Sequence, residues 1–214
     1  MILIPELETV VVLVPRTGSG SLRRAIAAKY PRSMLIYRHM EADGVPHGYD
    51  RWAKVGVVRH PVDRLWSLYK FLQRFDGQHD PAYIAAMRRS VDPSFSQWLT
   101  GNLVVFTSPY DRAGLGRFFP NFTVRHPLPE NQKSQFVYLR PDLGTTVYRY
   151  DTQLGELATR LGVNLESAPR TNDTEARCRP LLSPEAEAHI AKWFAWDLKH
   201  AVTPQPVAQG AEAS

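Results

Sequence analysis

VVVLVPRTGSGSLRRAI, residues 10–26, joins an apolar β-branched run to a loop of small residues and then to an amphipathic helix start. The run ends at Pro15, and the following loop contains Gly18 and Gly20. A buried strand that passes through such a loop into a helix can hold phosphate, because backbone N–H groups and the positive end of the helix dipole point at the anion. Glycine lets the backbone come close to it. The stretch therefore predicts an α/β fold with a phosphate-bearing ligand, or, in the simpler alternative, only a tight turn.

Strand and helix patterns alternate along the rest of the chain, which is typical of a parallel sheet with flanking helices. The predicted strands are residues 9–14, 33–37, 55–58, 136–139 and 146–150. The predicted helices are residues 19–29, 61–75, 81–89, 94–100, 153–161 and 184–200. We expect a three-layer α/β domain over residues 1–202, with a helical insertion at residues 76–131 that covers the acceptor region and a disordered tail at residues 203–214.

The composition is that of an ordinary globular protein, with 43% hydrophobic and 22% charged residues among 214. The net charge of +5 suits an anionic partner, such as a nucleotide, a sulfated substrate, a nucleic acid or a membrane surface. The single cysteine, Cys178, excludes an internal disulfide framework. No apolar run has the length of a membrane span, and the first residues do not read as a signal peptide. These features predict a cytoplasmic protein without a transmembrane segment.

The loop at residues 15–21 differs from the G-x-x-x-x-G-K-[ST] loop of nucleoside triphosphatases. It contains no lysine, and its nearest cation, Arg16, precedes the glycines. Hydrolysis of ATP by the usual arrangement is therefore disfavoured.

A second basic motif, RHPVDRLWSLY, occupies residues 59–69. Arg59 ends a predicted strand, so its guanidinium should lie at the carboxyl edge of the sheet, where open parallel sheets bind ligands. Ser67 lies in the early turns of the following helix, one turn after Arg64. Arg59 and Ser67 can hold a second phosphate; in the alternative, Arg59 pairs with an acid and Ser67 only packs.

Together the two segments resemble the motifs of the sulfotransferase family, specifically the carbohydrate-type enzymes with a P-loop-like fold. The family motif P-K-x-G-[ST]-[ST]-S binds a 5′-phosphosulfate, and residues 15–21 read PRTGSGS. Residues 59–69 match R-[DNH]-P-x-x-R-x-x-S-x-[YF], which binds a 3′-phosphate, at every defined position. Weaker likeness at residues 128–132, 147–151, 168–172 and 182–197 extends the resemblance over about residues 10–200. Arg16 replaces the usual lysine, and Gly20 replaces a hydroxyl residue.

The resemblance implies a donor, 3′-phosphoadenosine 5′-phosphosulfate, and a product, adenosine 3′,5′-bisphosphate. It implies a carbohydrate or similar hydroxylated acceptor, no nucleic acid partner and no metal. Arg59 and Ser67 would hold the 3′-phosphate. The 5′-phosphosulfate would lie on residues of the first loop: Arg16, Thr17, Gly18, Ser19, Gly20 and Ser21. Arg16 would also act in catalysis, by stabilising charge on the leaving phosphate oxygen.

Several family members take the acceptor proton with a histidine or glutamate from the segment after the second strand. His39 follows the predicted strand at residues 33–37, so it should emerge at the same sheet edge. A neutral imidazole near pH 7 suits proton abstraction, which makes His39 the preferred base. Glu41 and His47 are the fallback bases. The alternative for His39 is a surface or capping role.

Two other functions compete with sulfonate transfer. The first alternative is a catalytically weak or inactive sulfotransferase-like binding protein. It is suggested by Arg16, which stands where the family has lysine, because arginine and lysine are not equivalent at a phosphate. A P-loop kinase is less favoured, since the loop lacks its lysine and no acid of the magnesium-binding kind is evident.

Overall fold

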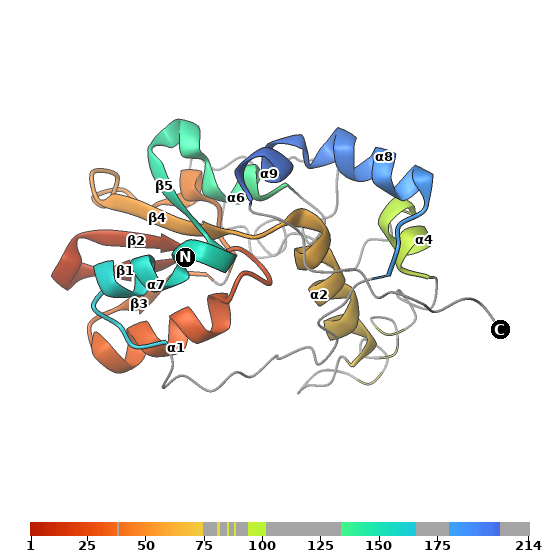
Figure 1. Ribbon diagram of the computed structural model, residues 1–214. Coiled ribbons are helices and arrows are strands. Elements are labelled where there is room, and N and C mark those ends of the chain that lie inside the picture. Colours follow the sequence, from red (N-terminus) through yellow and green to blue (C-terminus); the bar gives the residue numbers. More distant parts are fainter. Residues whose placement is uncertain are drawn as a thin grey trace.

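A five-stranded sheet lies on the left of the molecule as drawn in Figure 1. The computed structural model describes residues 1–37, 39–74, 94–101, 134–165 and 180–201, together with residues 81, 85 and 88. The strands are β1 (Ile2–Ile4), β2 (Thr9–Val12), β3 (Met34–Leu35), β4 (Ala53–Val58) and β5 (Thr145–Arg149), in the spatial order β3-β1-β2-β4-β5. Parallel pairing joins β2, β4 and β5. Their carboxyl ends therefore meet at one edge of the sheet.

β1 runs antiparallel to both of its neighbours, β2 and β3, so the prediction of a wholly parallel sheet is wrong at this strand. Only the short 3₁₀ turn η1 (Pro5–Leu7) and Glu8, with φ 45°, separate β1 from β2. A connection this short permits antiparallel pairing only, because a parallel neighbour needs a crossover of a dozen or more residues. The sheet is thus mixed but mostly parallel.

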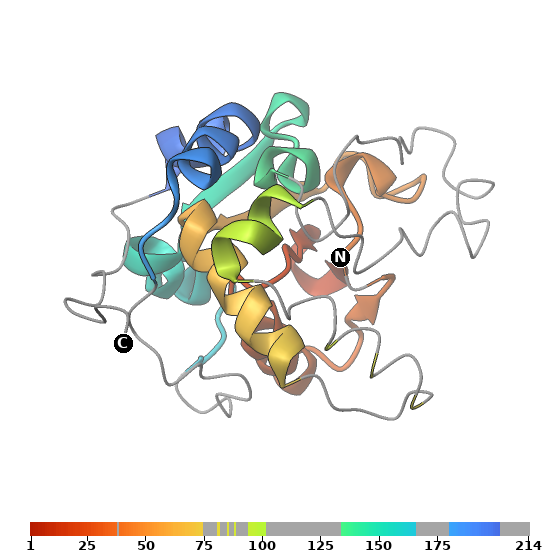
Figure 2. The ribbon, with the colours of Figure 1, turned by 90° about the vertical axis from the view of Figure 1, so that its right-hand side faces the viewer.

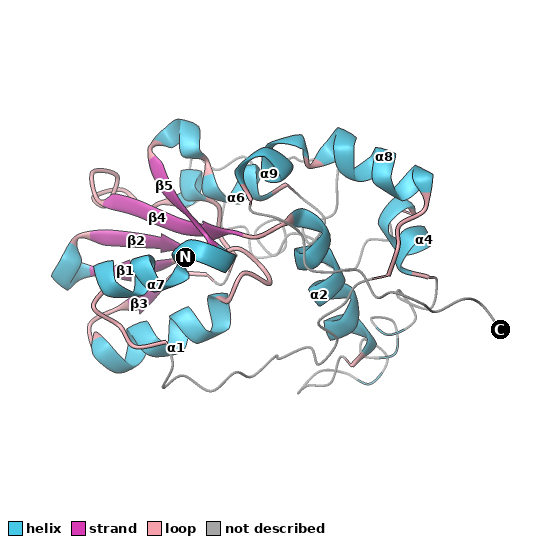
Figure 3. Ribbon diagram, viewed as in Figure 1, coloured by secondary structure: helices cyan, strands magenta, loops and turns pink. Residues whose placement is uncertain are grey.

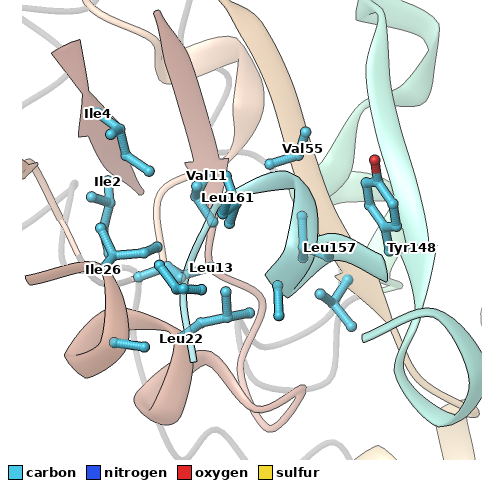
Figure 4. Close-up of a cluster of buried hydrophobic side chains, with 14 residues drawn as sticks. Ile2, Ile4, Val11, Leu13, Leu22, Ile26, Val55, Tyr148, Leu157 and Leu161 are labelled. Carbon is cyan, nitrogen blue, oxygen red and sulfur yellow. The ribbon is translucent and has the colours of Figure 1, made fainter. Parts of the chain in front are cut away.

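Helices cover both faces of the sheet (Figure 3). α1 (Ser19–Lys29) and α7 (Tyr150–Arg160) pack on one face, where Leu22, Ile26 and Leu157 meet Val11 and Val55 (Figure 4). α6 (Gln135–Leu139), α9 (Ala195–His200) and the segment with the 3₁₀ turn η2 (Ala42–Gly44) cover the other face. Along β1 and β2, successive apolar residues alternate between the two faces, as the pleat requires.

A separate helical group lies beyond the carboxyl edge of the sheet (Figure 2). It consists of α2 (Pro61–Gln73), α4 (Phe95–Thr100) and α8 (Pro184–Trp193), which share an aromatic-rich core around Leu65 and Trp98. α2 begins just after β4, so this group is joined directly to the edge of the sheet. None of the helices in the described ranges has the length and apolar character that crossing a membrane requires.

The predicted strand at residues 136–139 is wrong, because these residues form α6. Short apolar runs fit a strand and a buried helical turn equally well. Here Ser134 accepts a hydrogen bond from Phe136 N as the N-cap, and this starts the helix.

Other boundaries also moved. The predicted strand at residues 33–37 shortens to β3, and the last predicted helix breaks at Phe194 into α8 and α9. The predicted helix at residues 19–29 is confirmed as α1. The predicted helix at residues 81–89 and most of the insertion at residues 76–131 lie outside the described residues, as does the tail at residues 203–214.

Gly56 of β4 lets α6 lie directly against the sheet. A Cβ atom at this position would overlap Leu139 Cδ2 of α6 and would lie 3.2 Å from the Val12 carbonyl oxygen. The absence of a side chain at Gly56 therefore sets how closely α6 approaches the carboxyl half of β4. The 3₁₀ turn η5 (Pro141–Leu143) then leads from α6 into β5.

Candidate functional site

The loop between β2 and α1 has the shape of an anion cradle. Arg16 adopts a left-handed conformation with φ 66°, and Gly18 follows with φ 75° as the N-cap of α1. Thr17 Oγ1 donates a hydrogen bond of 3.0 Å to the Val14 carbonyl oxygen, which ties the loop to the end of the strand. α1 begins at Ser19, and the first N–H groups of a helix have no acceptor within it. The loop thus directs backbone donors and a dipole toward the carboxyl edge of the sheet.

Arg16 and Ser67 bring the two predicted motifs together. The Nε and Nη2 atoms of Arg16 donate to Ser67 Oγ over 3.2 and 3.0 Å, although the two residues are 51 positions apart. The same guanidinium lies 4.8 Å from the centre of the Phe71 ring on α2. Because Ser67 Oγ accepts from Arg16, its own O–H remains able to donate to an anion.

Arg59 adds a second guanidinium to this edge. Its Nη1 donates to the Arg16 carbonyl oxygen over 3.3 Å, and its guanidinium lies 4.9 Å from the centre of the Tyr150 ring. Its buried Nε has no hydrogen-bond partner among the described residues. Such an atom is costly to bury, so it favours an acceptor that a ligand would bring.

The two guanidinium groups concentrate positive charge at the site. Burial and, to a smaller extent, the nearby Arg59 cation lower the pKa of Arg16 to about 10, although Tyr150 opposes the change. Within the described part of the chain, neither arginine forms an ion pair with a carboxylate. Burial raises the pKa of the Asp151 carboxyl group, and the nearby Arg59 cation opposes this rise. The arrangement suits an anion with two charged groups.

Tyr150 was not predicted as part of the site. It is the first residue of α7, directly after β5, and its ring lies close to both the Arg59 guanidinium and Gly18 of the loop. Its Cε2 atom is 3.1 Å from where a Cβ of Gly18 would be. The sequence offered one signal for Tyr150. It stands at the end of a third predicted strand, and ligands bind at the carboxyl edge of such a sheet.

We expect Gly18→Ala to destabilise the protein by about 2 kcal/mol, since a non-glycine residue in this conformation is strained. The added methyl group would also press on the Tyr150 ring. Gly20→Ala is the matched control, because Gly20 is helical and its Cβ would meet only Arg24 Nη1 at 3.9 Å. It should leave stability unchanged or raise it by up to about 1 kcal/mol. Urea denaturation followed by circular dichroism measures both, and equal effects would contradict the prediction.

His39 lies at the same edge as Arg16. Its Nδ1 is 2.9 Å from the carbonyl oxygen of Leu13, at the end of β2. A carbonyl oxygen can only accept, so Nδ1 carries the proton, and Nε2 of a neutral ring then carries the lone pair. This tautomer is the one in which Nε2 can act as a base.

The two fallback bases differ in their surroundings. Glu41 is only 1% exposed. Burial lowers the pKa of the Met1 amino group, and the Glu41 carboxylate partly opposes this change. His47 lies in the turns that precede β4, with its side chain 69% exposed and 4.0 Å from Asp50. The Leu13 contact places His39 against the connection between β2 and α1, and His39 stays the preferred base.

The remaining loop hydroxyls have different surroundings. Thr17 is buried and engaged with Val14, whereas Ser21 Oγ accepts from Arg24 Nη2 over 3.5 Å. Ser19 is partly exposed at the start of α1. No group of three or more potential metal ligands occurs among the described residues.

Arg64, one turn before Ser67 on α2, lies in the buried core of the helical group. It is fully buried, its guanidinium is 6.0 Å from the centre of the Phe194 ring, and the Asp197 carboxylate opposes the lowering of its pKa by burial. The site is therefore built from Arg16, Arg59, Ser67 and the backbone of the loop, with Tyr150 and His39 beside them. Comparisons of the chain with protein-family models, with curated proteins and with solved structures returned no match.

Proposed function

We propose that this protein is a sulfotransferase that moves a sulfonate group from 3′-phosphoadenosine 5′-phosphosulfate to a hydroxyl of a carbohydrate or similar acceptor. The observation that carries the proposal is the pair of hydrogen bonds from Arg16 to Ser67. These bonds join the segment that resembles the 5′-phosphosulfate motif to the segment that resembles the 3′-phosphate motif. Arg59, with an unpartnered buried Nε beside them, fits the same doubly charged nucleotide.

The two cationic side chains have separate roles in this proposal. Arg59 and the Ser67 hydroxyl hold the 3′-phosphate, and Arg16 with the amides at the start of α1 holds the 5′-phosphosulfate. The donor supplies the activated sulfonate. The acceptor oxygen forms a bond to sulfur while the bond from sulfur to the phosphate oxygen breaks, and adenosine 3′,5′-bisphosphate leaves. Arg16 and the loop amides stabilise the charge on the departing oxygen, much as fixed charges do in phosphoryl transfer.

His39 takes the proton of the acceptor hydroxyl. Its Nδ1 contact with Leu13 holds the ring at the end of β2, in the same strand-to-helix connection that holds Arg16. Orientation of a base against the attacking oxygen is a large part of catalysis in such reactions.

Calorimetric titration with adenosine 3′,5′-bisphosphate and with adenosine 5′-monophosphate tests the proposal. We expect binding of the bisphosphate and much weaker binding of the monophosphate, because only the former reaches Arg59. Transfer of labelled sulfonate from the donor to a pool of oligosaccharides then tests catalysis. Absence of bisphosphate binding sinks the proposal. Binding without transfer to any acceptor favours the binding-protein alternative, and ATP-dependent phosphorylation that does not need Arg59 favours a kinase.

Arg59→Ala should weaken binding of adenosine 3′,5′-bisphosphate about 30-fold, because about 2 kcal/mol is typical for a charge-assisted hydrogen bond. Binding of adenosine 5′-monophosphate should change little. Arg51→Ala is the matched control, since Arg51 is exposed just before the amino end of β4. The prediction is wrong if both nucleotides lose affinity equally.

A further inference from the structure

Gln135 holds the backbone of Arg59 from both sides. The Arg59 N–H donates to Gln135 Oε1 over 2.9 Å, and Gln135 Nε2 donates to the Arg59 carbonyl oxygen over 2.6 Å. The Gln135 side chain is fully buried, and the two residues are 76 positions apart. The glutamine amide thus pairs with Arg59 in the way that a neighbouring strand would.

The hydrogen bonds between Gln135 and Arg59 lie just beyond the carboxyl end of β4. The last aligned pair of β4 and β5 is Val58 with Arg149, so Arg59 lies one residue past the ladder. Its backbone groups at this point need other partners. Gln135, at the start of α6, supplies them, and α6 is close enough to do so because Gly56 has no side chain.

Gln135 is itself held by a buried carboxylate. Its backbone N–H donates to Asp197 Oδ1 and Oδ2 over 2.9 and 3.1 Å, and Ser134 Oγ donates to Oδ1 over 2.8 Å. Asp197 belongs to α9 and is fully buried. A chain of contacts therefore runs from α9 through the start of α6 to the backbone of Arg59.

We propose that Gln135 is a positioning residue that sets the affinity for the 3′-phosphate by fixing the backbone of Arg59. This inference rests on the proposed function, because it concerns how that function's nucleotide is recognised. Gln135 acts through Arg59 and does not touch the nucleotide. A long arginine side chain on a fixed backbone loses less freedom when it binds, so the clamp preorganises the site.

Gln135→Met tests the inference, because methionine has a similar volume but cannot make either hydrogen bond. We expect the affinity for adenosine 3′,5′-bisphosphate to fall about 10-fold, which corresponds to the loss of about 1.4 kcal/mol from two hydrogen bonds. The affinity for adenosine 5′-monophosphate should change less than about 2-fold. Combined with Arg59→Ala, the substitution should cause no further loss of bisphosphate affinity, because its effect passes through Arg59.

Gln153→Met is the matched control. Gln153 Oε1 accepts from the backbone N–H of Arg149 over 3.1 Å, so it contacts an arginine at the end of the neighbouring strand. This variant should keep the discrimination between the two nucleotides. If Gln135→Met does not fold, as judged by circular dichroism, Gln135→Glu replaces it: it keeps an acceptor for the Arg59 N–H and should lose part of the discrimination.

The outcomes separate this inference from the proposed function. A wild-type protein that does not prefer the bisphosphate overturns both. A wild-type protein that prefers it, together with a Gln135→Met variant of unchanged preference, overturns the positioning role alone. Equal loss of affinity for both nucleotides also overturns that role, because it would show a general structural defect. A selective loss that disappears in the Arg59→Ala background supports it.

Discussion

Replacing His39 by alanine should lower the rate of sulfonate transfer about 100- to 10,000-fold, the usual contribution of a positioned general base. The expected result follows from the proposed role of the imidazole, which takes the proton of the acceptor hydroxyl. Binding of adenosine 3′,5′-bisphosphate should not change, because in the proposal Arg16, Arg59 and Ser67 hold the nucleotide and His39 acts only on the acceptor. The turnover rate of labelled sulfonate transfer and calorimetric nucleotide affinity, measured on the same preparation, give the two quantities.

His47→Ala is the matched control for His39→Ala. His47 is exposed before the amino end of β4, whereas the active edge of the proposal is the carboxyl end. Its replacement should leave both rate and affinity unchanged. A fall in rate for His47→Ala with a normal rate for His39→Ala would reverse the assignment of the base.

Replacing Asp197 by asparagine should destabilise the protein by about 3 kcal/mol, because it removes a buried acceptor of hydrogen bonds from Ser134 and Gln135 and a charge that stabilises the buried Arg64 cation. Burial raises the pKa of Asp197 and lowers that of Arg64, and each charge opposes the change in the other. Without the carboxylate, the fully buried Arg64 cation loses a negative charge that favours it. One of the acceptors of the Gln135 N–H is also replaced by a donor.

Asp142→Asn provides the comparison for Asp197→Asn. Asp142 pairs with Arg140 over 2.8 Å, but its side chain is 45% exposed. Its replacement should change stability by less than about 1 kcal/mol, because exposed ion pairs contribute little. Urea denaturation measures both variants. Similar midpoints for the two would show that the buried carboxylate does not stabilise the start of α6.

The parts of the fold that were predictable have strong local signals. The β-branched run and the small-residue loop predicted β2 and α1, and Pro61 at a first helical turn predicted α2. The rule that ligands bind at the carboxyl edge of a parallel sheet predicted that Arg16, Arg59 and Ser67 would lie together. Their hydrogen bonds agree with that placement.

Two of the features that were missed depend on contacts between distant segments. α6 is a helix because Ser134 and Asp197, 63 positions apart, organise its first turn. The hydrogen bond between Gln135 and Arg59 joins residues that are 76 positions apart. No spacing rule in the sequence connects such residues, since their pairing is created by the fold. Arg64 was expected one turn before Ser67 on α2, but the sequence did not predict that it would be fully buried near Asp197 and Phe194.

The side chains at positions 56 and 139 compete for the same space between β4 and α6. The space that a side chain at position 56 would need is already filled by Leu139. A larger residue in the strand can therefore be accommodated only if a smaller one replaces this leucine, or if α6 moves outward. Outward movement would carry Gln135 away from the end of β4. Related chains that depart from glycine here should thus show a compensating change at position 139, and a chain that changes one position without the other should bind its nucleotide less tightly.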